Sequence, residues 1–307
     1  MLLKGALILD CSILLPGPFV GKLLAKQGAR VLKIENPNRP DPARKMVPFY
    51  KDLNSCKELV LIDTLTADGR AEFARLVQKA DGLIEGFRPQ AKKKLGFDEA
   101  SLHAINPKLC IASIVGYPED GPWRDRAGHD LNFSAVTGCV SLFNEMPSLP
   151  LADLFAAYQA ALSLSSAIAG VARGAARGTR SVVSMSETLK DIQGGLIEEF
   201  RMSGVSPGPE GTLFSGRFPC YRLYQAKDGR RISVGAIEHK FWEKVCSILQ
   251  LPEVLEEGYA TGEKGLQTVA KIQARFESQN WSHWAPLFDS ADCCVEPVLN
   301  YQEVYGV

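Results

Sequence analysis

The stretch Ala6-Leu7-Ile8-Leu9-Asp10-Cys11 is a short apolar run, and it predicts a buried β-strand. Comparable runs recur along the chain, at residues 30–35, 58–63, 82–85 and 109–115. Helix-length segments lie between them, among them residues 21–27 and 66–79, the second with Thr66 as a possible cap. Strands that alternate with helices in this way form a parallel sheet with crossover connections. The sequence therefore predicts that its first part is a large α/β domain.

The pattern changes towards the second part of the chain. Two long helical segments, residues 154–173 and 187–202, enclose a strand-like run at 180–185 and precede a stretch rich in glycine and proline. Two strands follow it, at 218–225 and 231–235, and then helices that begin near residues 238, 269 and 281. We predict a large domain over residues 1–202, a linker over 203–216 and a smaller α+β domain over 217–307.

Composition limits the classes of partner. The chain has 307 residues, of which 46% are hydrophobic, and Lys+Arg and Asp+Glu both number 35. Without net charge there is no long-range field to attract nucleic acid or an anionic membrane, so the predicted partner is a small molecule. The longest apolar segment, residues 154–172, is rich in alanine and contains Gln159, which favours packing inside a domain over a membrane span.

Cysteine usage and the first residues predict a reducing compartment. The eight cysteines are scattered apart from Cys293-Cys294 and form no CxxC pair, and no HExxH motif occurs. The sequence therefore predicts no metal site. The apolar start lacks a basic region and a small-residue cleavage site, which indicates a buried strand rather than a signal peptide. We expect a cytoplasmic protein.

The sequence lacks the common nucleotide-binding motifs. The run Gly17-Pro18-Phe19-Val20-Gly21-Lys22 is one residue shorter than a phosphate loop and continues with Leu23, where a magnesium-binding hydroxyl is needed. No GxGxxG occurs after a strand. We interpret residues 15–19 as a tight strand-to-helix turn whose backbone amides lie near a ligand.

The tripeptide Gly128-His129-Asp130 and the later Asp153 supply groups suited to moving a proton on and off carbon. Taken alone, the triplet more often marks a helix start with a satisfied histidine. Asp153 precedes an apolar helix, so it can be an N-cap. The helix dipole would also hold its carboxylate ionised, which suits a base or a nucleophile. Residues 62–65 lie around the carboxyl end of the expected strand 58–63. Because ligands bind beyond the carboxyl ends of strands in open α/β sheets, we expect these residues to form the rim of a ligand site. Glu238 and Arg88, taken alone, are a helix cap and a surface charge.

Several further segments, taken together, match one known family. They are Leu15-Pro16-Gly17-Pro18-Phe19, Gly28-Ala29-Arg30-Val31, Phe87-Arg88-Pro89, Ile105-Asn106-Pro107-Lys108-Leu109, Gly128-His129-Asp130-Leu131-Asn132-Phe133, Leu151-Ala152-Asp153, Val234-Gly235-Ala236-Ile237-Glu238 and Cys294-Val295-Glu296-Pro297-Val298-Leu299. In this order they resemble the family III CoA transferases of the CaiB/BaiF type, and within them the α-methylacyl-CoA racemases. The histidine discriminates, because the racemases carry Gly-His-Asp whereas formyl-type transferases rely on the aspartate alone.

The resemblance implies a fold and a reaction. The fold is a Rossmann-like parallel-sheet domain with a smaller α+β domain, here without the C-terminal segment that usually returns to the first domain. His129 and Asp153 are implied to face opposite sides of the α-carbon of a 2-methylacyl-CoA and to exchange its proton through an enolate, whose oxygen backbone amides near Asp153 would stabilise. Asp130 and Glu238 would orient this pair, Glu238 coming from the neighbouring subunit of a homodimer. No cofactor is implied beyond the CoA of the substrate.

The resemblance also implies a set of CoA-binding residues and leaves two alternatives open. The set is Asn36, Arg39, Ile62, Asp63, Thr64, Leu65, Arg88, Gly128, Leu131, Asn132 and Phe133. In one alternative, the protein is a CoA transferase in which Asp153 forms an acyl anhydride. In the other, it binds acyl-CoA without turnover, because Asn36 replaces an arginine and glycines of the family are replaced by Ala156, Ala157 and Tyr158.

Overall fold

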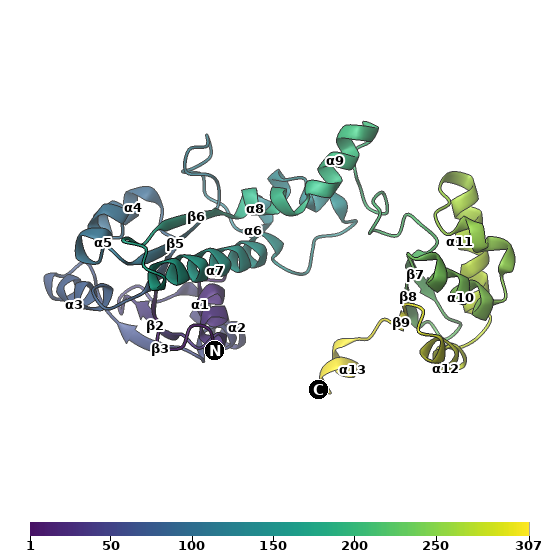
Figure 1. Ribbon diagram of the computed structural model, residues 1–307, viewed down its shortest axis with the longest axis horizontal. Helices are drawn as coiled ribbons and strands as arrows, with labels where there is room; N and C mark the ends of the chain where they lie inside the picture. Colours follow the sequence, from purple (N-terminus) through teal and green to yellow (C-terminus); the bar gives the residue numbers. More distant parts are fainter. Residues whose placement is uncertain (307) are drawn as a thin grey trace. The chain divides into compact units, whose positions relative to one another are not determined.

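The computed structural model describes residues 1–306, with the side chains of residues 89, 90 and 94 left out (Figure 1). The predicted Phe87-Arg88-Pro89 segment and the small domain, which ends at residue 307, therefore reach beyond the described parts. The chain divides into two compact units, Met1–Glu198 and Glu199–Val307. The division falls inside helix α9, Gly194–Ser203, whereas the sequence placed the end of the large domain at residue 202.

The first unit is built on a six-stranded sheet in which every described pair of neighbours is parallel. Its strands are β1 Leu7–Asp10, β2 Arg30–Glu35, β3 Glu58–Leu61, β4 Gly82–Glu85, β5 Cys110–Val115 and β6 Arg180–Ser184. The strand order is β3-β2-β1-β4-β5-β6, so the direction of winding reverses between β1 and β4. This is the doubly wound, Rossmann-like arrangement that the alternation of strands and helices predicts, and the predicted fold class is confirmed.

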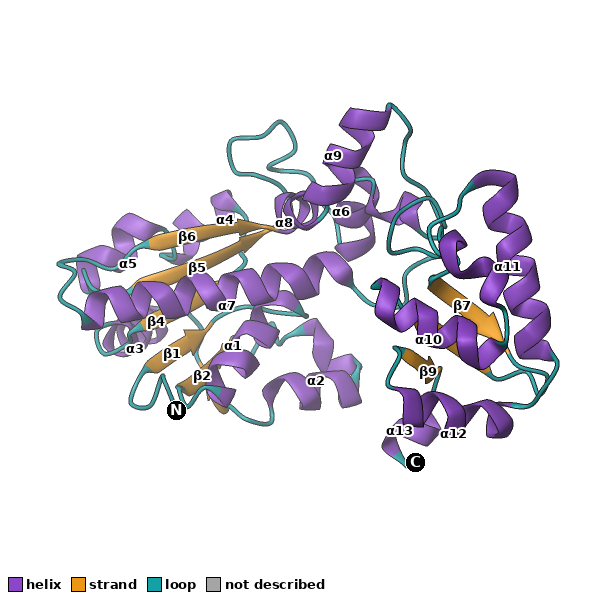
Figure 2. Ribbon diagram, turned by 45° about the vertical axis from the view of Figure 1, so that its right-hand side comes forward, coloured by secondary structure: helices purple, strands orange, loops and turns teal. Residues whose placement is uncertain are grey.

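Helices cover both faces of the sheet (Figure 2). They are α1 Pro16–Lys26, α2 Val47–Asn54, α3 Ala67–Val77, α4 Pro89–Leu95, α5 Glu99–Ile105, α6 Asp130–Val136, α7 Leu151–Ala172 and α8 Met185–Ile192. The predicted cap of α3 is confirmed, because Thr66 Oγ1 accepts the Gly69 N–H at 3.0 Å. The predicted tight turn over residues 15–19 is wrong: the helix already begins at Pro16, whose missing N–H costs nothing in a first turn.

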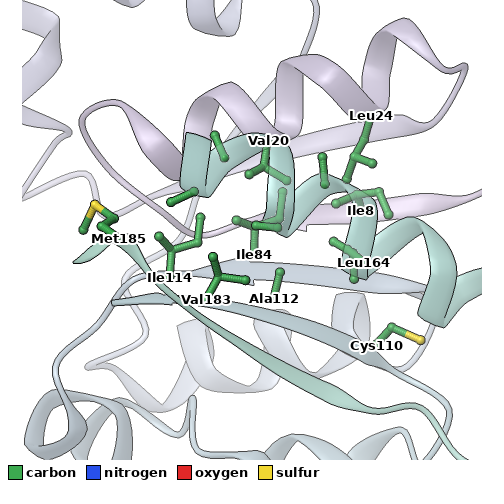
Figure 3. Packing of buried hydrophobic residues seen from close by; sticks show 14 of the residues in the cluster. Ile8, Val20, Leu24, Ile84, Cys110, Ala112, Ile114, Leu164, Val183 and Met185 are labelled. Carbon is green, nitrogen blue, oxygen red and sulfur yellow. The ribbon is translucent and has the colours of Figure 1, made fainter. Parts of the chain in front are cut away.

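Alternate residues of the strands pack into two separate cores, as the pleat of a sheet requires. Ile8, Ile84 and Ala112 lie in the core under α1 and α7, which Figure 3 shows from close by. Their neighbours Leu9, Leu83 and Ile111 lie in the other core, with residues of α3 and α5. Two-sided burial explains why these strands are continuous apolar runs in the sequence.

Helix α7 is the longest helix in the described chain, and it packs against α1, α8, β5 and β6. By length and composition alone it could cross a membrane, with 28% of its most apolar window buried. One side is a row of small buried residues that includes Ala156 and Ala160, while Phe155, Tyr158 and Leu162 are exposed on the other. The small residues allow α7 to lie close to the sheet.

The second unit is a smaller α+β fold. Strands β7 Tyr221–Gln225, β8 Arg231–Gly235 and β9 Val295–Pro297 form an antiparallel sheet in the order β7-β8-β9. Its helices are α10 His239–Leu249, α11 Gly262–Glu277, α12 Trp281–Ala291 and α13 Tyr301–Tyr305. The sequence did not predict β9, because three residues are too few to show an alternating pattern. Trp242, Phe276 and Trp284 lie at the centre of its core.

Candidate active site

A cavity of about 690 Å³ opens at the carboxyl ends of β1, β4 and β5. Its walls include residues 11–17, which follow β1, residues 86–88, which follow β4, and residues 114–117 around the end of β5. In open α/β sheets ligands bind where the winding reverses, and here that point lies between β1 and β4. The cavity therefore lies where the fold itself favours a ligand site.

The lining is apolar except for a few ionisable groups. Its apolar side chains include Leu14, Leu15, Met46, Phe49, Tyr117 and Met185. Its ionisable side chains include Arg88, Glu119, Arg124, Arg126, His129 and Asp153. A cavity with apolar walls and a small set of convergent polar groups is typical of sites for small molecules.

Two helices bring His129 and Asp153 to this cavity. His129 is the residue before α6, and its backbone N–H donates to Asn132 Oδ1 at 3.1 Å. Asp153 lies inside the first turn of α7, which begins at Leu151 after Pro150. The interpretation of Asp153 as an N-cap is therefore wrong, because the helix starts two residues earlier.

Burial raises the pKa of Asp153 to about 7, and the negative charge of Asp130 adds to the shift. The sequence predicted the opposite, a carboxylate held ionised by the helix dipole. That prediction failed because loss of hydration and a nearby like charge outweigh the partial charge of a helix end. A carboxyl group with this pKa is present in both protonation states near neutral pH, which suits a group that accepts and returns protons.

Asp130 lies beside Asp153 and holds the start of α7. Its Oδ1 accepts the backbone N–H of Asp153 at 3.0 Å, and burial raises the pKa of Asp130 as well. The next amide, that of Leu154, donates to Pro150 O at 3.0 Å. The amides of Asp153 and Leu154 are therefore occupied, and the predicted use of amides at this helix start to stabilise an enolate oxygen does not hold for these two.

A second buried carboxylate, Asp10, lies at the end of β1 and has cationic partners. Its Oδ2 accepts from Lys57 Nζ at 2.7 Å, and its Oδ1 accepts from the Ser12 hydroxyl. Burial raises the pKa of Asp10, but Lys33 and Lys57 outweigh that effect and lower it to about 2. Gly21 leaves room for this pair, since a Cβ there would lie 2.9 Å from Asp10 Oδ2.

The same charged cluster fixes the loop that lines the cavity after β1. Asp41 is 1% exposed, forms an ion pair with Lys33 at 3.3 Å, and accepts the N–H of Leu14 at 3.0 Å. Lys33 Nζ also donates to Ser12 O. Leu14 has a φ of 65°, a conformation that costs energy for a residue with a side chain. The buried ion pair and its hydrogen bonds therefore hold a strained backbone in the wall of the cavity.

Of the predicted CoA-binding residues, Arg88, Gly128 and Phe133 line the cavity. The ring of Phe133 packs so closely on two backbones that a Cβ at Gly128 would lie 2.6 Å from it, and one at Gly116 would lie 2.4 Å away. Both glycines are therefore required for the ring to close this side of the cavity.

The other predicted CoA-binding residues are not among those that line the cavity. Asn36 Nδ2 donates to Asp63 Oδ1 at 2.8 Å, and the backbone N–H of Leu65 donates to the same oxygen at 3.0 Å. These hydrogen bonds, led by the one from Leu65, lower the pKa of Asp63. The structure gathers these residues with Arg39 around the ends of β2 and β3. Ile62 and Thr64 are buried, so the expected rim presents mainly Leu65 to solvent.

The remaining predicted site residues lie elsewhere. Leu131 is exposed on α6, which also contains Asn132. Glu238 belongs to the second unit, where it is the exposed residue before α10 and makes no side-chain cap.

The three departures from the family pattern after Asp153 also lie outside the cavity lining. Ala156 and Ala157 are completely buried, while the exposed Tyr158 stacks edge-on against Phe19 at 5.6 Å. The structure thus places none of their bulk among the residues that line the cavity.

The sequence did not single out Arg124 and Arg126, which also line the cavity. Both belong to the loop between β5 and α6, just before Gly128-His129-Asp130. Two arginines three and five residues before that histidine could have indicated an anion-binding site. The sequence does not show, however, whether a side chain in a loop points into a cavity.

The chain was compared with known families, curated proteins and solved structures. The sequence model of the family described as CoA-transferase family III matches residues 3–306. The chain belongs to this family. It is 29% identical over 321 residues to the human alpha-methylacyl-CoA racemase, covering 99% of this chain and 79% of that protein. It is also 29% identical over 298 residues to the succinate–glutarate CoA-transferase of Agrobacterium fabrum, covering 89% of this chain and 72% of that protein.

Solved structures confirm the fold. A CAIB/BAIF family protein from Brucella suis superposes with a TM-score of 0.81 at 24% identity, over 99% of this chain and 85% of that one. The M. tuberculosis protein Rv3272 gives a TM-score of 0.84 at 22% identity, over 99% of this chain and 85% of that one. Because curated relatives of this family III chain include both racemases and transferases, its specific activity has to be argued from the site.

Proposed function

We propose that this family III enzyme inverts the 2-position of 2-methylacyl-CoA thioesters by two-base proton transfer. The observation that carries the proposal is that His129 and Asp153, from different helices, line one cavity, and that the pKa of Asp153 is about 7. A base and an acid that exchange roles in the reverse direction must each be stable in both protonation states near neutral pH.

The reaction needs one group on each face of the α-carbon. One of His129 and Asp153 removes the α-proton, which leaves an enolate of the thioester, and the other returns a proton to the opposite face. Each turnover exchanges the protonation states of the two groups, which leaves them ready for the reverse direction. Asp130, bonded to the Asp153 amide, acts as a positioning residue. The reaction uses no cofactor beyond the CoA of the substrate.

The direct test is incubation of the protein with a single epimer of a 2-methylacyl-CoA in deuterated water. We expect exchange of the α-proton together with loss of stereochemical purity. His129→Ala and Asp153→Asn should each lose inversion of the 2-position, because both bases are needed for it and proton transfer by a placed group contributes about 100- to 10,000-fold. Unchanged turnover in the His129→Ala protein would refute the two-base mechanism.

A CoA transferase is the second candidate, and the similarity to the Agrobacterium fabrum transferase supports it. In that reaction the Asp153 carboxylate attacks the thioester carbonyl, forming an acyl anhydride and releasing CoA as thiolate. The thiolate then attacks the aspartyl carbonyl of the anhydride, which releases the donor acid as a carboxylate and leaves an aspartyl-CoA thioester. Trapping with hydroxylamine followed by mass spectrometry of the Asp153 peptide separates the candidates, since only the transferase forms a covalent adduct. Calorimetric CoA binding without either reaction would support a homologue that binds acyl-CoA without turnover.

We also propose that the active species is a cytoplasmic homodimer. The exposed apolar side chains Phe155, Tyr158 and Leu162 on α7 offer surface for a second copy, and all eight cysteines are free, which fits a reducing compartment. In this dimer Glu238 completes the partner's site. Specific activity should then fall on dilution as dimers dissociate. A mixture of His129→Ala and Asp153→Ala proteins should stay inactive, because both groups belong to one unit.

A further inference from the structure

Arg126 differs from the other cavity arginines in how it is held. Its guanidinium lies 5.2 Å from the centre of the Trp123 ring. Trp123 packs edge-on against the buried Tyr117 at 5.4 Å, and Tyr117 packs edge-on against Phe133 at 5.1 Å. Phe133 in turn is seated against the backbone of Gly116 and Gly128. A chain of three aromatic rings in edge-on contact thus links Arg126 to Gly116, which follows the end of β5.

Arg126 also lacks an acidic partner among the described residues, although it lines the cavity. The neighbouring Arg124 lines the same cavity, but its Nε donates to Asp125 Oδ2 at 3.3 Å. A guanidinium that is oriented by aromatic rings, and whose N–H groups have no acidic partner, is preorganised to bind a carboxylate or a phosphate. Ordering the side chain in advance lowers the entropy cost of binding such a group.

We propose that Arg126 is an anion-binding residue of the cavity, which takes an oxyanion group of the bound acyl-CoA. The proposal rests on acyl-CoA being the ligand, as in the proposed function. Two parts of such a ligand carry oxyanions: the phosphates of CoA, and the terminal carboxylate of a dicarboxylic acyl chain. Both are recognised by the same donor fork.

The test measures binding by calorimetry with four ligands: CoA, 3′-dephospho-CoA, succinyl-CoA and butyryl-CoA. We expect Arg126→Met to weaken binding of at least one of them about tenfold, the loss typical of a removed hydrogen bond to a charged group. Equal losses for CoA and 3′-dephospho-CoA assign the contact to the diphosphate. A loss for CoA, succinyl-CoA and butyryl-CoA but not for 3′-dephospho-CoA assigns it to the 3′-phosphate. A loss for succinyl-CoA but not butyryl-CoA assigns it to the acyl carboxylate.

Two further variants separate recognition from structure. Arg124→Met is the matched control, from the same loop but with a guanidinium already bonded to Asp125. It should weaken binding less than Arg126→Met. Trp123→Leu keeps the charge of Arg126 but removes the ring that orients it, so we expect a smaller loss for the same ligands. Unchanged melting temperatures establish that the variants are folded.

The possible outcomes distinguish this proposal from the proposed function. Normal binding of all four ligands by Arg126→Met would overturn the role of Arg126 but not the proposed function. Losses of binding in Arg124→Met equal to those in Arg126→Met would do the same. Wild-type protein that binds none of the ligands would overturn both proposals. Loss of α-proton exchange with intact binding would bear on the reaction and leave Arg126 unaffected.

Discussion

Two carboxyl groups near the same edge of one sheet, the buried Asp10 and the half-buried Asp153, have pKa values that are shifted in opposite directions. Asp10, after β1, is surrounded by Lys33, Lys57 and Ser12, and its pKa falls to about 2. Asp153, at the start of α7, has Asp130 as its charged neighbour, and its pKa rises to about 7. Burial raises the pKa in both cases, so the sign of the nearby charges decides the outcome.

The surrounding charges separate a structural carboxylate from a chemically active one in this fold. The fully compensated Asp10 cannot give or take a proton near neutral pH, and it serves to hold the loop after β1 in place. The charged form of Asp153 destabilises the fold, because the side chain is half-buried and no cation among the described residues lowers its pKa. Groups of this second kind gather at functional sites. Four experiments test whether Asp10 and Asp153 differ in this way.

The largest expected effect is the loss of activity in Asp153→Asn. The amide keeps the size of the side chain but can neither accept nor return the proton, so inversion of the 2-position should fall about 100- to 10,000-fold. The loss of stereochemical purity of a single 2-methylacyl-CoA epimer measures it, with calorimetric CoA binding as the control. Asp10→Asn, assayed at a temperature where it is folded, should keep far more activity. Equal losses in the two variants would contradict the distinction.

The next effect is the loss of stability in Asp10→Asn. Removing one member of a buried ion pair leaves Lys57 without its charge partner, and such losses cost about 3–5 kcal/mol. Urea unfolding at pH 7 measures the free energy of unfolding. The double variant Asp10→Asn/Lys57→Met should be less destabilised than the sum of its single variants, because the two side chains interact directly. A cost below about 1 kcal/mol for Asp10→Asn would show that the pair contributes little.

The sequence alone was enough for the sheet, while the roles of the two central site residues stay a prediction. The central strands are buried on both faces, so Leu7–Asp10 and Gly82–Glu85 are visible as apolar runs without reference to the rest of the fold. His129 and Asp153 were identified through the family resemblance. The predicted rim at residues 62–65 follows β3, whereas the cavity lies at the reversal between β1 and β4. Strand order is a tertiary property, and the succession of strands along the chain does not contain it.

The electrostatics of the site could not be predicted for a similar reason. Asp130 and Asp153 are 23 positions apart, and the hydrogen bond that joins Asp130 Oδ1 to the Asp153 amide exists only in the folded chain. The raised pKa of Asp153 depends on that proximity and on burial. In the same way, the orientation of Arg126 depends on the contact of its guanidinium with the Trp123 ring.

The third effect is a change in how stability depends on pH. The pKa of Asp153 is about 7 in the folded protein, against 3.8 for an unperturbed aspartate. The folded state therefore holds the proton more tightly, and its stabilising contribution is full below pH 3.8 and lost as the pH rises through 7. Asp153→Asn removes this loss, so its stability relative to wild type should be greater at pH 8 than at pH 5. The difference should be a few kcal/mol at most, since one pKa unit corresponds to about 1.4 kcal/mol. Urea unfolding of both proteins at the two pH values measures it.

Asp10→Asn is the matched control for that pH dependence. Because the folded pKa of Asp10 is lowered to about 2, its contribution is complete above pH 3.8 and is lost only as the pH falls through 2. The cost of Asp10→Asn should therefore be the same at pH 5 and pH 8. Parallel stability curves for Asp153→Asn and wild type over this range would contradict the raised pKa of Asp153.

The smallest expected effect comes from an ion pair outside the core. Arg30 and Glu58 join β2 to β3 with N···O at 2.6 Å, and the two side chains are 62% and 56% exposed. Water already solvates both charges, and ordering two long side chains costs entropy, so Arg30→Met should unfold in urea within experimental error of wild type. Methionine keeps the apolar stem of the arginine, which limits the change to the charge. Any difference that is seen should shrink with added salt. A cost as large as that of Asp10→Asn would mean that an ion pair's contribution here does not depend on burial, and the contrast between the two carboxylates would then lose its physical basis.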